Sequence, residues 1–476
     1  MGSFTSRVVH GRDGDLPALT PIERIGPKSY PRYLFPFELP DNYDINEVAR
    51  ILEAGLKAAQ KRLPVMACEA VPDTQAKQAG VMKLKKIRDK RFKFITFKDL
   101  RKPGVFPATY QDLKEKNFPV SFFDEDKLCR LSSPFPNFDE RLPVSIVQVN
   151  FIKGGMLLSW CLLHMFGDGK TYNVWMKVWA EECRRASGLK IREPYHMPKA
   201  MWKDRKKIMK PSGRNAGRLE DHPEYIIAPF KPTGAPPKMR SKSHRGQVFY
   251  FSPEALQELK AETLPEKAAL SRDQEWISTN DALSALLWRT VMAVQHPLDR
   301  LEGDPVSYFD LAIDGRLRTN PPVHPHTLGC WLEYIDVSMP IRQLITTASL
   351  ADIAILIRKA IERANRDGAY TDDLVAMIDK LEDVDRLVIT SLLDMPGTNC
   401  MLTSWKDFAL YNIDWGYKLG GNIQAVRAHS VGVINGLQVV LPELPDGGLE
   451  VLVGVEESCL ERLMNEPLWN RFAVAR

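Results

Sequence analysis

The first half of the chain alternates between helix-like and strand-like patterns of apolar side chains. In residues 41–62 the apolar positions recur every three or four residues, which predicts a long amphipathic helix. Residues 144–152 and 156–163 are two β-prone apolar runs, and the Lys-Gly-Gly sequence at 153–155 predicts a tight turn that joins them in a hairpin. A second amphipathic helix is expected over residues 171–185, because its Val and Trp side chains share one helical face.

The second half returns to the same alternation after a long irregular stretch. Residues 186–245 are rich in Pro, Lys and Arg, and this composition predicts an extended crossover. A strand is expected at 246–251, and helices are expected at 253–262 and 280–294. Strand and helix patterns then alternate to the end of the chain, so we predict a mixed α/β protein.

The length of the chain, 476 residues, allows two or three domains. The patterns divide it into an N-terminal domain (1–190), a Pro-rich basic linker (191–245) and a C-terminal domain (246–476). A chain of this length buries enough surface to be stable without disulfides or a structural metal, and none is predicted.

The charge balance argues against a nucleic-acid-binding protein. The chain has 65 Lys and Arg against 60 Asp and Glu, a net charge of +5, whereas such proteins usually concentrate far more positive charge on one face. Basic runs at residues 77–93 and 190–214 are interrupted by apolar residues and Pro. We interpret them as solvated helix faces and linker, with contact to a phosphorylated cofactor as the alternative.

The cysteines and the N-terminal segment favour a cytoplasmic protein. Seven scattered cysteines with no Cys-x-x-Cys pair suit free thiols in a reducing compartment. Residues 1–17 lack the apolar core of a signal peptide, and no run approaches 18 apolar residues. We expect a monomer with no membrane span.

The sharpest chemical feature is the sequence His-Met-Phe-Gly-Asp-Gly at residues 164–169. The two glycines and the preceding strand argue against a continuous helix. His164 is therefore expected at the mouth of a sheet, where an ordinary pKa of about 6.5 suits a general base. Asp168 either orients the imidazole or holds the loop through an Arg, and a purely structural role for both residues is the alternative.

The order of motifs around His164 resembles the BAHD acyltransferase superfamily. Residues 148–180 match its strand, Gly-Gly turn, second strand, His-x-x-x-Asp-Gly motif and following helix. Its Ser-x-x-Asp…Trp-Arg helix, Arg-containing strand with a Pro-Pro loop, and Ser-Trp…Asp-Phe-Gly segment have counterparts at 278–289, 314–329 and 404–417. Residues 19–22 resemble its opening segment, so the resemblance spans nearly the whole chain.

The resemblance implies two chloramphenicol-acetyltransferase-like domains, with mixed sheets flanked by helices and an active-site channel at the domain interface. Acyl-CoA, as co-substrate, would enter this channel from one face and a small-molecule acceptor from the other. His164 would take the acceptor's proton as the acceptor attacks the thioester, with no covalent enzyme intermediate and no bound cofactor. Strand alternation points Cys161 away from His164, which makes it a poor acyl carrier.

Roles for individual residues follow from the same resemblance. The catalytic pair would be His164 and Asp168, with Asp168 turned away from the imidazole toward Arg316. Structural support of the site is assigned to Gly169, Arg316, Asp414, Trp415 and Gly416. Contacts to coenzyme A are assigned to Ser278 and Thr279, which open a helix able to receive phosphate oxygens, and to Thr403 and Ser404.

The chain departs from the family pattern in two places. In the segment 414–420, Trp415 replaces Phe, Tyr417 replaces Trp, and Lys418 and Gly420 replace Gly and Pro. Cys330 stands where Asn is usual, which puts the acceptor side of the pocket in question. The divergent segment and the long crossover resemble fungal members of the superfamily, which act in specialised metabolism, more than plant members.

The function that the resemblance implies is transfer of an acyl group, with acetyl as the default, from CoA to a hydroxyl of a hydrophobic specialised metabolite. Three alternatives stay open: acylation of nitrogen, an acyl donor bound to a carrier protein, and a non-catalytic relative that only binds a metabolite. Leu163 stands where condensation domains usually have a second His, and this single His and the absence of an attached carrier domain favour free CoA over a carrier protein.

Overall fold

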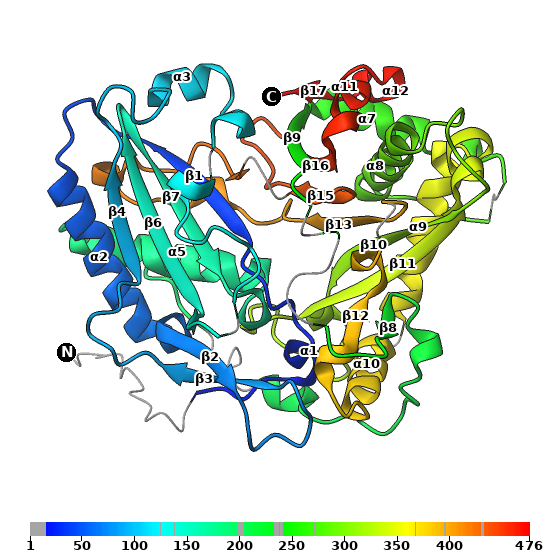
Figure 1. Cartoon of the computed structure of the whole chain (residues 1–476), viewed down its shortest axis with the longest axis horizontal. Coiled ribbons are helices and arrows are strands. Elements are labelled where there is room, and N and C mark those ends of the chain that lie inside the picture. The colour runs from blue at the N-terminus through cyan, green and yellow to red at the C-terminus, as the bar shows by residue number, and fades with distance from the viewer. Residues whose placement is uncertain are drawn as a thin grey trace.

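The structure is a computed structural model, and it describes residues 16–123, 125–137, 139–197, 204–232, 238, 241–270, 273–366, 368–394, 397–429 and 433–476. A five-stranded mixed sheet in the order β14-β1-β7-β6-β4 forms the core of one half (Figure 1). Its strands are β1 (Arg32–Glu38), β4 (Ile95–Asp99), β6 (Ser145–Ile152), β7 (Gly155–Leu162) and β14 (Arg427–Ala428). Helices α2 (Ile45–Arg62) and α5 (Gly169–Ala186) pack together on one face, and α3 (Tyr110–Glu115) packs on the other.

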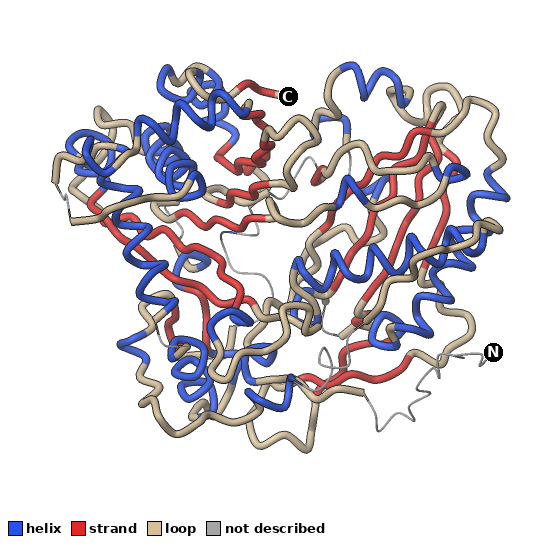
Figure 2. The backbone as a smooth tube through the Cα atoms, turned by 180° about the vertical axis from the view of Figure 1, so that it is seen from behind, coloured by secondary structure: helices blue, strands red, loops and turns tan. Residues whose placement is uncertain are grey.

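A seven-stranded mixed sheet in the order β11-β10-β13-β15-β16-β9-β17 forms the core of the other half. The strands are β9 (His244–Phe251), β10 (Val306–Asp314), β11 (Leu332–Pro340), β13 (Cys400–Ser404), β15 (Leu437–Val440), β16 (Leu449–Glu456) and β17 (Val474–Ala475). The helices packed on it include α7 (Pro253–Glu262), α8 (Thr279–Gln295), α9 (Leu350–Asn365), α11 (Glu457–Met464) and α12 (Pro467–Asn470). Figure 2 shows the two groups of strands on opposite sides of the molecule, seen from behind.

Smaller elements complete the described part of the chain. One three-stranded sheet joins β2 (Cys68–Pro72), β3 (Met82–Lys86) and β5 (Leu142–Pro143), and β8 (Tyr225–Ile227) pairs with β12 (Leu387–Ile389). The remaining helices are α1 (Pro21–Arg24), α4 (Glu125–Leu128) and α10 (Ala369–Asp379).

Elements set by local sequence lie where the sequence predicts them. The hairpin of β6 and β7 pairs in antiparallel register, and Gly154 takes the positive φ of 79° that its turn requires. The helix predicted over 41–62 begins at Ile45, because the Asp44 side chain accepts a hydrogen bond from the backbone N–H of Asn46 and caps it. Helices α5, α7 and α8 and strand β9 match their predictions to within two residues at each end.

Three local predictions were wrong. Residues 82–86 form a strand, not a helix face or linker, because β2 pairs with them in antiparallel register. The stretch 186–245 is not wholly extended, because it contains 3₁₀ helices at Asp204–Ile208 and Leu219–Asp221. Residues 198–203, 233–237 and 239–240 lie outside the described residues. Arg316 follows β10 on a 3₁₀ turn (Gly315–Arg318), which Asp314 caps by accepting from the Arg316 backbone N–H at 3.1 Å.

The segment 405–428 leaves the seven-stranded sheet and packs on the other half. Trp415 meets Trp179 of α5 and Phe37 of β1 edge-on, at centroid distances of 5.1 and 5.4 Å. Strand β14 at its end pairs with β1. The two halves are thus interleaved in the chain, because a segment from the second half completes the sheet of the first.

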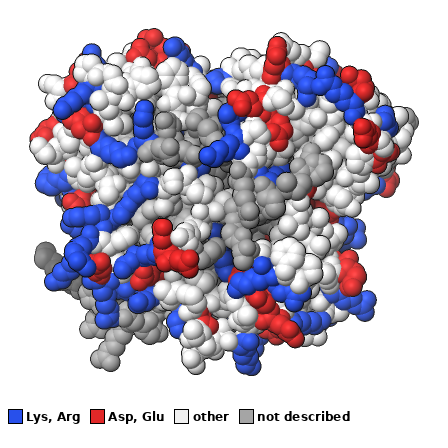
Figure 3. Space-filling view, viewed as in Figure 1, with Lys and Arg blue, Asp and Glu red and all other residues white. Residues whose placement is uncertain are grey.

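Charged side chains of both signs are interspersed over the face shown in Figure 3. The exposed lysines of β3 illustrate this, since Lys83 lies 3.1 Å from Asp73 and Lys85 lies 3.8 Å from Glu69. Such exposed pairs contribute little to stability. Of the helices in the described ranges, none is both long enough and apolar enough to cross a bilayer.

Candidate active site

A cavity of about 1380 Å³ lies between the two halves. Its lining is mostly apolar and comes from both halves, including Ser29, Tyr30, His164, Leu332, Thr403 and Val439. Single small-molecule sites are usually about 300–1,000 Å³. The cavity is therefore large enough for the reacting ends of two ligands at once.

His164 lies at the wall of this cavity, where β7 ends in a 3₁₀ turn (His164–Phe166). Its backbone N–H donates to the carbonyl of Ser29 at 2.9 Å, which fixes the turn against the segment before β1. The Cys330 sulfur lies 3.8 Å from Nδ1. Burial lowers the pKa of His164, opposed in smaller part by a hydrogen bond to its own backbone and by the charge of Asp168.

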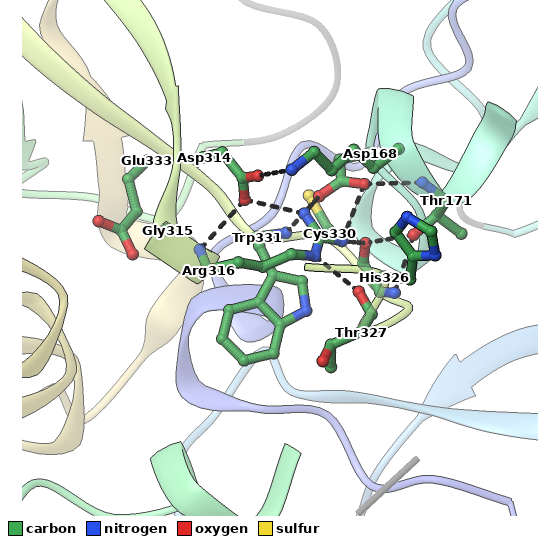
Figure 4. A network of polar contacts seen from close by, with 12 residues as sticks. Asp168, Thr171, Asp314, Gly315, Arg316, His326, Thr327, Cys330, Trp331 and Glu333 are labelled. Atoms are coloured by element: carbon green, nitrogen blue, oxygen red, sulfur yellow. Dashed lines mark hydrogen bonds and ion pairs between the residues drawn. The ribbon is translucent and has the colours of Figure 1, made fainter. Parts of the chain in front are cut away.

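Asp168 makes a two-pronged ion pair with Arg316, at 2.6 and 3.1 Å (Figure 4). It also caps α5 by accepting from the backbone N–H of Thr171 at 3.0 Å. Burial works to lower the pKa of Arg316, but the carboxylates of Asp168 and Asp314 outweigh it and the pKa is raised. The sequence expectation for the Asp168–Arg316 pair therefore agrees with the geometry.

The same ion pair holds the loop 327–331 beside His164. Arg316 Nε donates to the carbonyl of Thr327 at 2.6 Å, and the backbone N–H of Trp331 donates to Asp168 at 3.0 Å. Thr171 Oγ1 donates to the Gly329 carbonyl at 2.8 Å and accepts from the N–H of the same residue at 2.9 Å. Asp168 thus holds the loop whose Cys330 sulfur lies beside the imidazole of His164.

Of the other residues assigned to structural support, Gly169 follows Asp168 directly, whereas residues 414–416 lie toward the far end of α5. A side chain at Gly169 would collide with the ring of Phe408. Asp414, in an exposed turn, accepts from the backbone N–H of Gly416 at 2.7 Å and from Arg184 at 3.2 Å. Gly416 has a φ of 89°, and Trp415 is buried in the core of the N-terminal half.

The four residues assigned to coenzyme A divide between two places. Thr403 lines the cavity, but Ser404 next to it is exposed, and neither Ser404, Ser278 nor Thr279 is among the lining residues. Ser278 caps α8, and its Oγ accepts from Arg358 at 2.9 Å. Contact of Ser278, Thr279 and Ser404 with coenzyme A stays a prediction that this lining does not support, whereas Thr403 lies on the cavity wall.

Sequence reasoning missed a second buried ion pair that supports the loop. Arg205 donates to both carboxylate oxygens of Glu23 and, at 2.8 Å, to the carbonyl of Leu328. Glu23 also accepts from the backbone N–H of Cys330 at 3.3 Å. The available signal was the capping box formed by Thr20 and Glu23, which is readable from their spacing. Among the described residues, no group of three or more His, Cys, Asp or Glu has the arrangement of a metal site.

Two family models match the chain. The Transferase family matches residues 124–467, more than half of the chain, and the trichothecene 3-O-acetyltransferase-like N-terminal domain matches residues 30–183. The chain belongs to the Transferase family of BAHD acyltransferases. The resemblance read from the motifs is confirmed, and the activity is that of the family, acyl-CoA-dependent acyl transfer.

Curated relatives of this BAHD acyltransferase are fungal proteins. It is 28% identical over 415 residues to eremophilane O-acetyltransferase prx11 of Penicillium rubens, covering 80% of this chain and 82% of prx11. It is 26% identical over 445 residues to trichothecene 3-O-acetyltransferase TRI101 of Fusarium sporotrichioides, covering 92% of each. It is 29% identical over 457 residues to enoyl-CoA isomerase/hydratase claC of Penicillium crustosum, covering 94% of this chain but spanning only 50% of claC.

Solved structures confirm the predicted two-domain α/β fold. TRI101 of F. graminearum, complexed with coenzyme A and deoxynivalenol, superposes with a TM-score of 0.80 at 22% identity, covering 96% of this chain and 99% of that one. Vinorine synthase superposes with a TM-score of 0.60 at 15% identity, covering 98% of this chain and 95% of that one.

Proposed function

We propose that this acyltransferase moves an acetyl group from acetyl-CoA to a hydroxyl of a hydrophobic metabolite, with His164 as general base. The observation that carries the proposal is an imidazole with a lowered pKa on the wall of a large, mostly apolar cavity between the two halves. The relatives named O-acetyltransferases support acetyl as the acyl group and oxygen as the acceptor atom.

The reaction needs the tautomer of His164 that leaves one ring nitrogen free to accept a proton. We assign the proton to Nδ1, which lies 3.8 Å from the Cys330 sulfur. This leaves Nε2 unprotonated and available as a base.

The proposed reaction runs in two steps. The acceptor oxygen attacks the thioester carbonyl while its proton passes to Nε2 of His164, which gives a tetrahedral oxyanion. The oxyanion then collapses, the carbon–sulfur bond breaks, and the sulfur of CoA leaves with the proton from His164. Proton transfer of this kind contributes about 10²–10⁴-fold to a rate.

The cysteines near His164 support direct transfer without an acyl-enzyme. Cys161 and Cys129 lie with their sulfurs 3.3 Å apart, and neither lines the cavity. Cys330 is nearer to the imidazole, but it too is absent from the lining, and burial raises the pKa of its thiol well above the usual value. A neutral thiol is a poor nucleophile.

Calorimetry of the purified chain with acetyl-CoA, followed by thiol-release assays with alcohols and amines, tests this function. Micromolar binding and turnover with alcohols are expected. Binding without any turnover would favour the non-catalytic relative, and faster turnover with amines would favour acylation of nitrogen. No binding to any acyl-CoA, with turnover of an acetylated carrier protein, would overturn the free-CoA donor.

A further inference from the structure

Tyr334 of β11 brings a hydroxyl group to the same cavity as His164, and the reaction described above does not use it. The residue lines the cavity and is only 7% exposed. Its neighbour Tyr225, whose ring meets it edge-on at 6.3 Å, is absent from the lining, and the Tyr225 hydroxyl is closed off from solvent without a partner. The Tyr334 hydroxyl also has no hydrogen-bond partner among the described residues, but it is not closed off. A ligand that covers it must replace its hydrogen bond to water or lose affinity.

The pairing of β10 with β11 directs the Tyr334 side chain toward the cavity. Tyr334 lies opposite Ala312, and both line the cavity together with Leu332, two positions earlier. Glu333 between them is fully buried and absent from the lining, as the alternation of side chains along a strand requires. The Tyr370 hydroxyl donates to the backbone carbonyl of Tyr334, which fixes the strand at this position. The phenol is therefore held by a rigid element, as a specific binding group requires.

Apolar side chains surround the Tyr334 ring on the cavity wall. Those that belong to the same apolar cluster and also line the cavity are Ile25, Ala312, Leu332, Leu387, Ile389 and Met401. The phenol is the one polar group that this part of the cluster offers to a ligand. The pantetheine arm of coenzyme A has two amides and would need polar partners for both, so an apolar ring system with a single oxygen fits this wall better.

The charge behind this wall argues against phosphate groups here. Asp310 and Asp336 lie opposite each other, on the same face of β10 and β11 as Tyr334 but beyond the lining. Burial raises the pKa of Asp310 to about 7 and that of Asp336 to about 6. At pH 7 Asp336 is therefore mostly ionised, and its negative charge repels phosphates. The partner of the phenol is thus expected on the acceptor and not on CoA.

Tyr334 lies close enough to His164 for one small molecule to reach both. The Cys330 sulfur lies 3.8 Å from Nδ1 of His164, and Tyr334 follows Cys330 by four residues. Four extended residues span at most about 14 Å. Leu332, between Cys330 and Tyr334, also lines the cavity. The separation therefore corresponds to the length of a compact ring system.

We propose that the Tyr334 hydroxyl donates a hydrogen bond to a second oxygen of the acyl acceptor, a carbonyl oxygen on the same rigid apolar ring system as the reacting hydroxyl. This inference rests on the proposed function. Burial is the main cause that raises the pKa of Tyr334, so the phenol keeps its proton and can donate. A carbonyl oxygen can only accept, which matches that donor.

The test is a double-mutant cycle with one change in the protein and one in the acceptor, measured by thiol release from acetyl-CoA. Three pairs of acceptors differ by a ketone: cyclohexanol and 4-hydroxycyclohexanone, decahydronaphthalen-2-ol and 6-hydroxydecahydronaphthalen-2-one, and androstan-3-ol and androsterone. Tyr334→Phe removes only the hydroxyl. In at least one pair, the preference of the wild type for the ketone in kcat/KM should exceed that of Tyr334→Phe by about fivefold.

Tyr225→Phe is the matched control, because it removes the same hydroxyl from the adjacent ring, outside the cavity lining. It should keep the preference of the wild type in every pair. The dissociation constant of acetyl-CoA, measured by calorimetry, should change less than about threefold in both variants.

Two results would overturn the inference while leaving the proposed function intact. One is a preference that agrees within about twofold between the wild type and Tyr334→Phe in all three pairs. The other is a loss of more than about tenfold in the affinity of Tyr334→Phe for acetyl-CoA, because the phenol would then serve the donor. A wild type that binds acetyl-CoA but releases no thiol with any alcohol would overturn the proposed function and this inference together.

Discussion

Two motifs in this chain have the same chemistry and different consequences. In each, an Asp at the start of a helix pairs with a buried Arg from another element: Asp168 of α5 with Arg316, and Asp281 of α8 with Arg358. The first pair joins the two halves and holds the loop beside His164. The second joins α8 to α9 within one half, and none of the four partners lines the cavity itself. Location, and not residue type, therefore distinguishes the pair beside His164 from the pair in the core.

The use of the carboxylate oxygens differs in the same way. Both carboxylate oxygens of Asp168 accept hydrogen bonds, from the Arg316 guanidinium and from the backbone N–H groups of Thr171 and Trp331. Only Oδ2 of Asp281 accepts hydrogen bonds, from the backbone N–H of Ser278 and from Arg358. Its Oδ1 has no hydrogen-bond partner among the described residues. Asp168 therefore connects three elements at the reaction centre, whereas Asp281 connects two in the core.

The largest effect on turnover should come from substitution of His164, which has no counterpart in the second motif. His164→Ala removes the base and is expected to lower turnover of acetyl-CoA with an alcohol by about 10²–10⁴-fold. The dissociation constant of acetyl-CoA should change less than about threefold, because the base acts on the acceptor. Thiol release and calorimetry measure the two quantities.

His196→Ala, at an exposed histidine, is the matched control for His164→Ala and should keep full turnover. Turnover in His164→Ala within tenfold of the wild type would contradict the assignment of the base.

Replacing each Asp by Asn should separate the effect of each ion pair on stability from its effect on turnover. Asp168→Asn and Asp281→Asn each leave a buried guanidinium without its carboxylate, which is expected to lower the free energy of unfolding by about 3–5 kcal/mol. Only Asp168→Asn should also lower turnover, by about 100-fold, because displacement of a supporting loop misplaces the reacting groups. Urea unfolding and initial rates below the unfolding transition measure both effects.

A double variant, Asp281→Leu with Arg358→Met, is expected to recover most of the stability lost in Asp281→Asn, since it removes both charges. Equal losses of turnover in Asp168→Asn and Asp281→Asn would contradict the distinction between the two motifs.

Glu333 extends the comparison to a buried carboxyl with no ion pair among the described residues. Burial raises its pKa to about 8. Between its ordinary pKa of 4.5 and this value, the folded state keeps a proton that the unfolded state loses, so stability should fall as pH rises. Glu333→Gln cannot titrate, so from pH 5 to pH 8 its free energy of unfolding should rise relative to that of the wild type, by at most about 1.4 kcal/mol per pH unit. Thermal unfolding at each pH measures the difference.

Glu461→Gln, at an exposed glutamate, is the control for this pH dependence and should follow the wild type at every pH. A constant difference between Glu333→Gln and the wild type across that range would show that Glu333 is ionised in the folded state.

The smallest effect is expected at the cap of the second motif. Ser278→Ala removes the hydroxyl that accepts from the Asp281 N–H at 3.2 Å, at a cost of about 1 kcal/mol in the free energy of unfolding. The affinity for acetyl-CoA should stay unchanged. Ser252→Ala, at the cap of α7, is the matched control, and a selective tenfold loss of CoA affinity in Ser278→Ala would restore the predicted contact with coenzyme A.

The sequence was a good guide wherever neighbours along the chain decide the structure. The turn at Gly154 and the caps at Asp44 and Asp168 fix their elements through bonds within a few residues. A capping residue does not by itself indicate a binding site. Ser278 begins a helix as predicted, but it does not line the cavity. A local signal predicts the helix and does not say what faces it.

By itself, the sequence determined the main helices, the central hairpin and the motif that places His164 at a strand end. Hydrophobic periodicity, turn glycines and capping residues act over a few residues, so each can be read from the chain. The tertiary structure alone decided that β14 completes the sheet of the other half, that Glu23 and Arg205 brace the loop of Cys330, and that Tyr334 shares a cavity with His164. These contacts join residues up to several hundred positions apart, and their pairing depends on packing and register that local patterns do not encode.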